Sequence, residues 1–78
     1  MEATRTEVEM KLSARNQLGG TIKRVVPGAV NTEVTLEIGN GVDVVAVITS
    51  ESVERLGLAV GKRAYAIVKA SDVLIATD

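Results

Sequence analysis

The sequence has 78 residues, nine of them Lys or Arg and ten Asp or Glu, which gives a formal net charge of −1. This length fits one domain, and a hydrophobic content of 46% is that of a globular chain rather than a disordered one. No apolar run is long enough for a signal peptide or a membrane span, and the near-neutral charge gives no long-range attraction to nucleic acid. We therefore expect a small cytoplasmic domain.

The core must be built from aliphatic side chains, because the chain has one Tyr and neither Phe nor Trp. A single core of this size rarely supplies more than ~3–5 kcal/mol of stability without a staple. The chain has no Cys for a disulfide, and no Cys or His for a structural zinc ion. The sequence therefore predicts that oligomerisation supplies the missing stability.

The first half of the chain has the patterns of strands. Residues 1–6 are expected to form a loose extension, and residues 8–12 alternate apolar and charged side chains with a period of two. Residues 21–26 form a second strand candidate, which ends at the turn signal Pro27-Gly28. Residues 30–38 alternate cleanly and predict a half-buried antiparallel strand. Its buried face is predicted to carry Val30, Thr32, Val34, Leu36 and Ile38.

A hairpin is predicted at Gly39-Asn40-Gly41, since the positive φ of such turns suits Gly and Asn. The following strand, residues 42–49, is apolar on both faces. A domain of this size can cover only one face with its own core. We therefore expect the other face, with Val45 and Val47, to meet another subunit.

One short helix is predicted after this strand, with Thr49 or Ser50 as its N-cap and Gly57 as its C-terminal stop. Val53 and Leu56 would lie on its buried side. Residues 63–70 and 72–77 are two further strand candidates, joined at Ser71 and Asp72. Five or six short strands with one helix predict an all-β fold, a small OB-like Greek-key barrel.

Catalysis and nucleic-acid binding are not expected. Without His or Cys, the usual nucleophile–base pairs are absent, so we predict no catalytic residues and no enzyme activity. OB-type barrels that bind single strands use aromatic platforms, worth ~1–3 kcal/mol per stacked base, and a basic groove. One Tyr and a balanced charge provide neither, and the sequence encodes no helix-turn-helix.

Three clusters of hydrogen-bond donors suggest that the chain binds an anion. The first combines Arg15 with the Ser13 hydroxyl and the backbone amide of Ala14. The second is the start of the helix, at Thr49 to Ser52. In the third, Lys69 and Ser71 are two residues apart and would share one face of a strand. A small tetrahedral oxyanion would satisfy all three clusters.

Each cluster also has an ordinary structural interpretation. Ser13 and Asn16 would simply form a turn, with Arg15 as a surface cation, and the hydroxyls at the helix start would act only as caps. Lys69 would be a solvated lysine, and a bend or bulge would account for Gly19 and Gly20 without a ligand. Composition and spacing leave both interpretations open.

Four segments resemble the molbindin (Mop) family, whose domain also occurs as the TOBE domain of molybdate regulators and transporter ATPases. They are LSARNQLGGTI (12–22), VTLEI (34–38), VVAVITSESVERLGL (44–58) and AIVKASDVLIAT (66–77). The resemblance covers nearly all of residues 11–77 in order. It implies that residues 11–78 form one Mop/TOBE domain, preceded by an N-terminal extension and the start of the first strand at 1–10.

The resemblance also implies an oxyanion site. The family forms a hexamer, a trimer of dimers, and binds molybdate or tungstate between subunits, so the segments of Arg15 and Lys69 are expected to meet across an interface. Asn16 and Gln17 would support the turn or the interface, and no side chain would coordinate a metal directly. The ligand residues implied by position are Ser13, Ala14, Arg15, Thr49, Ser52, Lys69, Ala70 and Ser71.

The resemblance implies a function in intracellular storage or homeostasis of the oxyanion. The alternative is a non-enzymatic oligomerisation or regulatory module of a molybdate transport or regulation system. Neither alternative requires a nucleic-acid or membrane partner.

Overall fold

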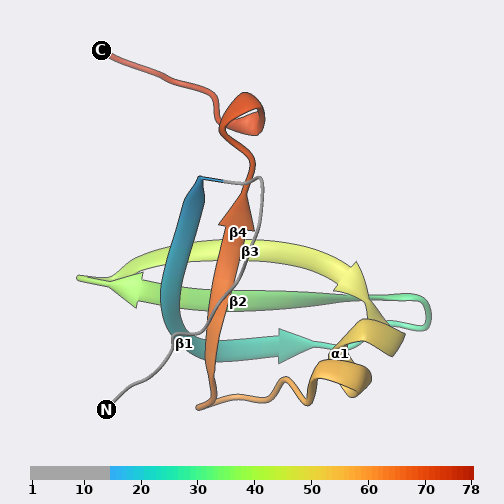
Figure 1. Cartoon of the computed structure of the whole chain (residues 1–78). Coiled ribbons are helices and arrows are strands. Elements are labelled where there is room, and N and C mark those ends of the chain that lie inside the picture. Colours follow the sequence, from blue (N-terminus) through green and yellow to red (C-terminus); the bar gives the residue numbers. More distant parts are fainter. Residues whose placement is uncertain (1–14) are drawn as a thin grey trace.

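A computed structural model describes residues 15–78, whose strands form one four-stranded antiparallel sheet in the order β3-β2-β1-β4. Figure 1 shows that the sheet curls, so that β4 and the first part of β1 cross over β2 and β3 as one half of a barrel. This curled sheet with one short helix confirms the predicted OB-like, all-β fold. The elements are β1 (Asn16–Val26), β2 (Asn31–Gly39), β3 (Val42–Thr49), α1 (Ser50–Leu56), β4 (Arg63–Val68) and the 3-10 turn η2 (Ala70–Asp72).

The bent strand β1 joins the two parts of the half-barrel. Its first six residues pair with β4, and the register with β2 begins at Thr21 and shifts between Ile22 and Arg24. Gly20 is buried, and a Cβ there would overlap the carbonyl oxygen of Glu37 on β2. The strand was predicted to start at residue 21, and this start was wrong. Pairing with β4 extends the strand back to Asn16, and Gly20 allows β1 to approach the backbone of β2.

The core is small and lies where β1 and β2 pair. Ile22 is fully buried, and Val34 and Leu36 are 6% and 5% exposed. Thr32 and Thr35 of β2 are buried as well. Further side chains that pack around this core while staying partly exposed are Val25, Ile38, Ile48, Val53, Leu58, Ala64 and Ala66.

The predicted hairpin and helix are both confirmed. Gly39, Asn40 and Gly41 all have positive φ, with 51° at Asn40, and they connect β2 to β3. Thr49 caps α1, and Gly57 ends it in the left-handed conformation with φ of 66°. These features form where predicted because the residues of each turn fix its local geometry.

Three side chains differ from the predicted pattern of burial. Val30 precedes β2 and is exposed, and Leu56 at the end of α1 is exposed although Val53 packs against the core. Thr35 was predicted to face solvent but is buried, because β2 is an interior strand flanked by Arg24 of β1 and Val45 of β3.

The predicted last strand at residues 72–77 is not present in the described part of the chain. Two turn hydrogen bonds, from the Asp72 amide to the Lys69 oxygen and from the Val73 amide to the Ala70 oxygen, close η2 instead. The segment that follows leaves the sheet beyond the end of β4 (Figure 1), and its Leu74 is 91% exposed. The predicted strand at residues 8–12 lies outside the described residues.

Candidate functional site

The first and last predicted donor segments lie side by side in one chain. Asn16 at the start of β1 is the register partner of Val68 at the end of β4, and the Asn16 side-chain amide donates a 3.1 Å hydrogen bond to the Val68 oxygen. Arg15 and Lys69 are the flanking residues and therefore share this end of the sheet. The single chain therefore places both cations at one end of the sheet, and their meeting across a subunit interface stays a prediction.

The neighbours of Arg15 in the first donor segment differ in how far the structure describes them. Ser13 and Ala14 lie outside the described residues. Gln17 is on β1 opposite Ile67 and is exposed. Asn16 supports the β1–β4 pairing rather than forming the turn predicted for it.

The Lys69–Ser71 segment has a different geometry from the predicted one. β4 ends at Val68, and Ala70 and Ser71 belong to η2, with Lys69 as its N-cap in extended conformation. The two side chains therefore do not share one strand face, because the turn rotates Ser71 relative to Lys69. Lys69, Ala70 and Ser71 are exposed at the molecular surface.

The hydroxyl groups at the start of α1 are hydrogen-bonded to each other. The Ser52 amide donates to Thr49 Oγ1 at 3.1 Å, and Thr49 Oγ1 donates to Ser52 Oγ at 2.7 Å. Arg55 Nη2 also donates to Ser52 Oγ, at 3.3 Å. The capping interpretation of Thr49 is therefore confirmed. Because the Ser52 oxygen is the acceptor in both side-chain bonds, its own proton is left for another acceptor.

The side-chain contacts of Arg55 and Ser50 were not predicted. Arg55 lies three residues after Ser52, a spacing that places side chains on the same helix face and would have revealed the contact. The Ser50 hydroxyl donates to the Gly28 oxygen at 2.9 Å and lies 2.7 Å from the hydroxyl of buried Thr32. That second contact joins residues 18 positions apart, and no local pattern in the sequence indicates it.

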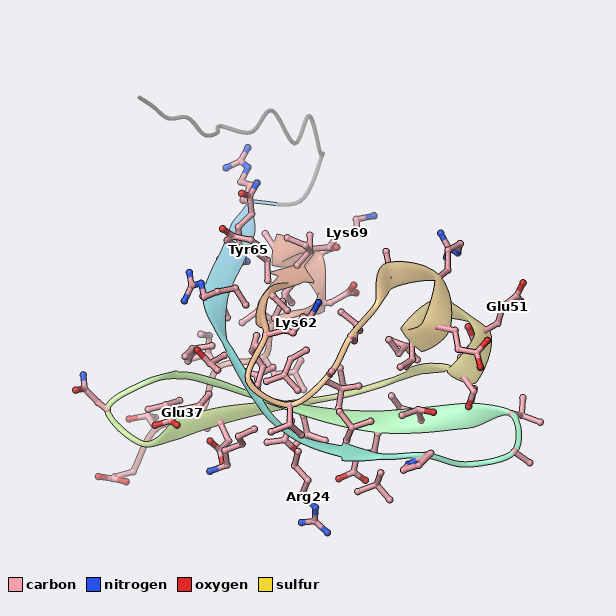
Figure 2. The ribbon with its side chains drawn as sticks, turned by 90° about the horizontal axis from the view of Figure 1, so that it is seen from below. Arg24, Glu37, Glu51, Lys62, Tyr65 and Lys69 are labelled. Carbon is pink, nitrogen blue, oxygen red and sulfur yellow. The ribbon has the colours of Figure 1, made fainter. Side chains whose placement is uncertain are left out.

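The helix cluster is far from the Arg15–Lys69 end within one chain. Thr49 is the register partner of Asn31, where β2 begins, and the paired end of β1 there is Val26 rather than Asn16. Figure 2 shows Lys69 and Glu51 of α1 in separate parts of the molecule, and Figure 1 shows the same separation of η2 and α1. The three predicted clusters therefore form two groups.

The concave side of the half-barrel holds an apolar cavity of about 550 Å³. Its floor is Val34 and Leu36 of β2, and its walls come from β3 and β4. A charged ligand would lose its hydration there without gaining donors. The lining is aliphatic except for Tyr65, and it separates this cavity from the donor groups at the surface.

Neither a metal-binding cluster nor a membrane-spanning helix is found in residues 15–78. That part of the chain contains no group of three or more His, Cys, Asp or Glu side chains placed to hold a metal ion. Its helices are also too short to cross a membrane as apolar spans.

The comparisons identify the family. The model of the TOBE domain matches residues 12–75, and the chain therefore belongs to the TOBE domain family. Within that class, the chain is 42% identical over 69 residues to a probable molybdenum-pterin-binding protein of Haemophilus influenzae, covering 88% of this chain and all of that one. It spans only 26% of the molybdenum transport protein ModE of Azotobacter vinelandii, at 46% identity over 71 residues.

Solved structures agree with this assignment. A molybdate-binding protein from Sporomusa ovata superposes with a TM-score of 0.82 at 37% identity, covering 87% of this chain and all of that one. The cytoplasmic molybdate-binding protein ModG with molybdate bound gives a TM-score of 0.80 at 48% identity, covering 83% of this chain and 46% of that one. The chain thus has the sequence and the fold of single Mop-type domains.

Proposed function

We propose that this chain is a non-catalytic oxyanion-binding protein that takes up molybdate or tungstate. The observation that carries the proposal is the pairing of Asn16 with Val68, which are the sequence neighbours of Arg15 and Lys69. The molybdate-binding relatives support the choice of ligand, since a tetrahedral dianion has the charge and the acceptors that this donor set requires.

In the proposed site, Arg15 and Lys69 supply the charge. Ser13, Ala14, Ala70 and Ser71 supply hydroxyl and amide donors from the two segments around them. Arg15 presents a planar fork of N–H donors, and Lys69 adds a compact point charge. Hydrogen bonds to charged groups contribute ~1.5–3 kcal/mol each, so several together can offset the loss of hydration of the dianion.

The helix cluster would complete the site from a neighbouring subunit. Within one chain Thr49 and Ser52 lie too far along the sheet from Asn16 to join Lys69. Ser52 would donate its hydroxyl proton to the anion, while Thr49 and Arg55 hold its oxygen in place. We propose accordingly that the anion binds between subunits of an oligomer, a hexamer in the form implied by the family resemblance, and that the assembly stores or buffers the oxyanion in the cytoplasm.

Calorimetric titration with molybdate, tungstate and sulfate at fixed ionic strength tests the proposal. Replacing Arg15 by Ala should weaken molybdate binding about 10-fold or more, because one charge-assisted contact of ~1.5–3 kcal/mol is lost. Arg24→Ala is the matched control, since Arg24 is an equally exposed arginine on β1 that points away from Lys69 in Figure 2. Equal affinity for the Arg15→Ala and Arg24→Ala proteins would remove Arg15 from the site.

The second candidate is an assembly or regulatory module without a ligand of its own. It is favoured by the exposed apolar side chains of β3, where Val45 and Val47 are 58% and 65% exposed. Native mass spectrometry separates the two functions. An anion-binding protein should gain the mass of molybdate, whereas a pure assembly module should show the same oligomer mass with and without the anion.

A further inference from the structure

The start of α1 is fixed to the sheet through Ser50. Its backbone amide donates a 2.8 Å hydrogen bond to the Val30 oxygen, and its hydroxyl donates to the Gly28 oxygen at 2.9 Å. Both acceptors belong to the loop between β1 and β2, which lies beside α1 in Figure 1. Ser50 therefore ties the first residue of the helix to a loop that reaches back 22 positions in the sequence.

A buried threonine completes this anchor. Thr32 is 2% exposed and lies on the face of β2 that carries Val34 and Leu36. Its hydroxyl oxygen is 2.7 Å from Ser50 Oγ. Because the Ser50 proton is already donated to Gly28, Thr32 is the donor in this contact. The groups therefore form one chain of hydrogen bonds, which runs from the Thr32 hydroxyl through Ser50 Oγ to the Gly28 oxygen.

Packing of the core does not explain a hydroxyl group at residue 32. Valine has nearly the same shape as threonine, and β2 uses it two positions further on, at Val34. A buried hydroxyl loses its hydration and regains a comparable hydrogen bond, so it gains little over an apolar side chain of the same shape. What the Thr32 hydroxyl adds is direction, because a hydrogen bond fixes Ser50 Oγ in distance and angle.

Ser50 lies between the two hydroxyl residues of the helix cluster. Thr49 Oγ1 accepts a hydrogen bond from the Ser52 amide and donates one to Ser52 Oγ. These bonds fix the two side chains relative to each other, but they do not fix the pair relative to the sheet. The anchor at Ser50 supplies that second constraint, since it holds the residue between them.

We propose that Thr32 and Ser50 are positioning residues of the oxyanion site. They hold the Thr49–Ser52 pair at a fixed place on the sheet, so that the free proton of the Ser52 hydroxyl is aimed at the anion. Neither Thr32 nor Ser50 binds the anion, since the protons of both hydroxyls are used within the anchor. This inference rests on the proposed function, and it names the part of the fold that sets the affinity of that site from the inside.

Removing both hydroxyls together separates positioning from stability. In the Thr32→Val/Ser50→Ala protein no buried donor is left without its partner, so the urea midpoint should stay close to that of the parent chain. Calorimetric titration should nevertheless show molybdate binding weakened about 5-fold or more, because Ser52 is no longer held in the geometry that a hydrogen bond to the anion needs. An affinity equal to that of the parent chain would overturn the proposal.

Thr32→Ser is the opposite change, because it keeps the hydroxyl and removes the methyl group. The urea midpoint should fall, since a small cavity is left in the core, while the molybdate affinity should stay within about 2-fold of the parent value. Thr35→Val is the matched control, since this second buried threonine lies on the other face of β2, and it should leave the affinity unchanged. An affinity that simply followed the urea midpoint across these variants would show that the anchor is only structural.

Amide hydrogen exchange measures the anchor in the absence of an anion. The Ser52 amide donates to Thr49 Oγ1, and it should exchange about 3-fold faster or more in the Thr32→Val/Ser50→Ala protein, because the helix start opens more often. The Gly57 amide at the other end of α1 should exchange at the parent rate. Equal exchange of Ser52 in parent and variant would contradict the proposal. If the parent chain failed to bind molybdate while Ser52 exchanged faster in the variant, the proposed function would be wrong and the anchoring of Ser52 would stand.

Discussion

The two sides of this half-barrel differ in how completely one chain can bury them. Where β1 and β2 pair, Ile22, Val34 and Leu36 are almost fully excluded from water, and the buried Thr32 hydroxyl is paired with Ser50. On the side of β3, β4 and the C-terminal segment, large apolar side chains stay exposed. These are Val42, Val45, Val47, Tyr65, Ile67, Val73, Leu74 and Ile75.

The difference shows which interactions the chain makes alone. The β1–β2 side is buried within one subunit, because Gly20 allows the backbone of β1 to lie against that of β2. The apolar cavity above Val34 and Leu36 stays open between β3 and β4, and each of these two strands has one unpaired edge in the four-stranded sheet. A monomer of this size has a small stability margin, so the open side is where association would add to it.

The strongest test of this comparison is the same chemical change on each side. Ile22→Ala should lower the free energy of unfolding by about 2–5 kcal/mol, because it leaves a cavity in a fully buried position. That is as large as the whole stability expected for an isolated core of this size. Urea unfolding followed by circular dichroism measures it, with Ile22→Val as a milder variant that should lose only ~0.5–1.5 kcal/mol.

Ile75→Ala is the matched change on the open side. Its effect should depend on protein concentration, with little change at high dilution and a measurable loss when subunits associate. A large loss that is independent of concentration would mean that Ile75 belongs to the core of its own subunit. The contrast between the two sides would then be wrong.

A pair of adjacent glycines gives a smaller and sharper test of the closed side. A Cβ on Gly20 would meet the Glu37 backbone, including its carbonyl carbon at 2.9 Å, whereas a Cβ on Gly19 would meet the ends of the Arg63 and Tyr65 side chains at 3.0 and 3.1 Å. Backbone cannot move aside as a side-chain end can. Gly20→Ala should therefore cost ~1–3 kcal/mol, and Gly19→Ala should cost clearly less. Equal losses would contradict the close approach of β1 and β2.

The features that were predictable from the sequence are those fixed by neighbouring residues. Gly39-Asn40-Gly41 and the helix from its Thr49 cap to Gly57 formed as expected, because the required φ values and capping bonds are local. The short strands with one helix also predicted the OB-like fold, and the solved structures of Mop domains confirm it. The burial of Thr32, Val34 and Leu36 on one face of β2 also followed from simple alternation.

The features that were not predictable depend on distant partners. The start of β1 at Asn16 is set by Val68, 52 residues away. The predicted strand at residues 72–77 did not form, because a strand needs a neighbour that this end of the half-barrel does not supply within residues 15–78. The arrangement of the candidate site also depends on residues that are distant in the sequence. Sequence identified Arg15 and Lys69 as donors, but only the pairing of β1 with β4 shows that they share one end of the sheet.

The smallest expected effect comes from a surface ion pair that links the two sides. Lys23 Nζ on β1 lies 2.9 Å from Asp43 Oδ2 on β3. The hydrogen bond that Lys23 donates to the Asp43 carboxylate raises the pKa of Lys23 above its ordinary value of 10.5. The charge of Asp43 adds to this effect, loss of hydration opposes it, and the charge of Glu37 contributes least. The folded state therefore favours the protonated amine. Its contribution to stability is fully present below about pH 10.5 and is lost as the pH rises through the raised pKa.

Lys23→Gln should thus lower the urea midpoint slightly at neutral pH and low salt. The difference from the parent chain should shrink in high salt, because both side chains are partly exposed and their charges are screened. It should shrink again at alkaline pH, as Lys23 loses its proton in the parent. Lys62→Gln, an exposed lysine in the turn before β4, is the control and should show a smaller difference. A Lys23→Gln difference that stays constant across salt and pH would mean that the aliphatic stem of Lys23, rather than its charge, links β1 to β3.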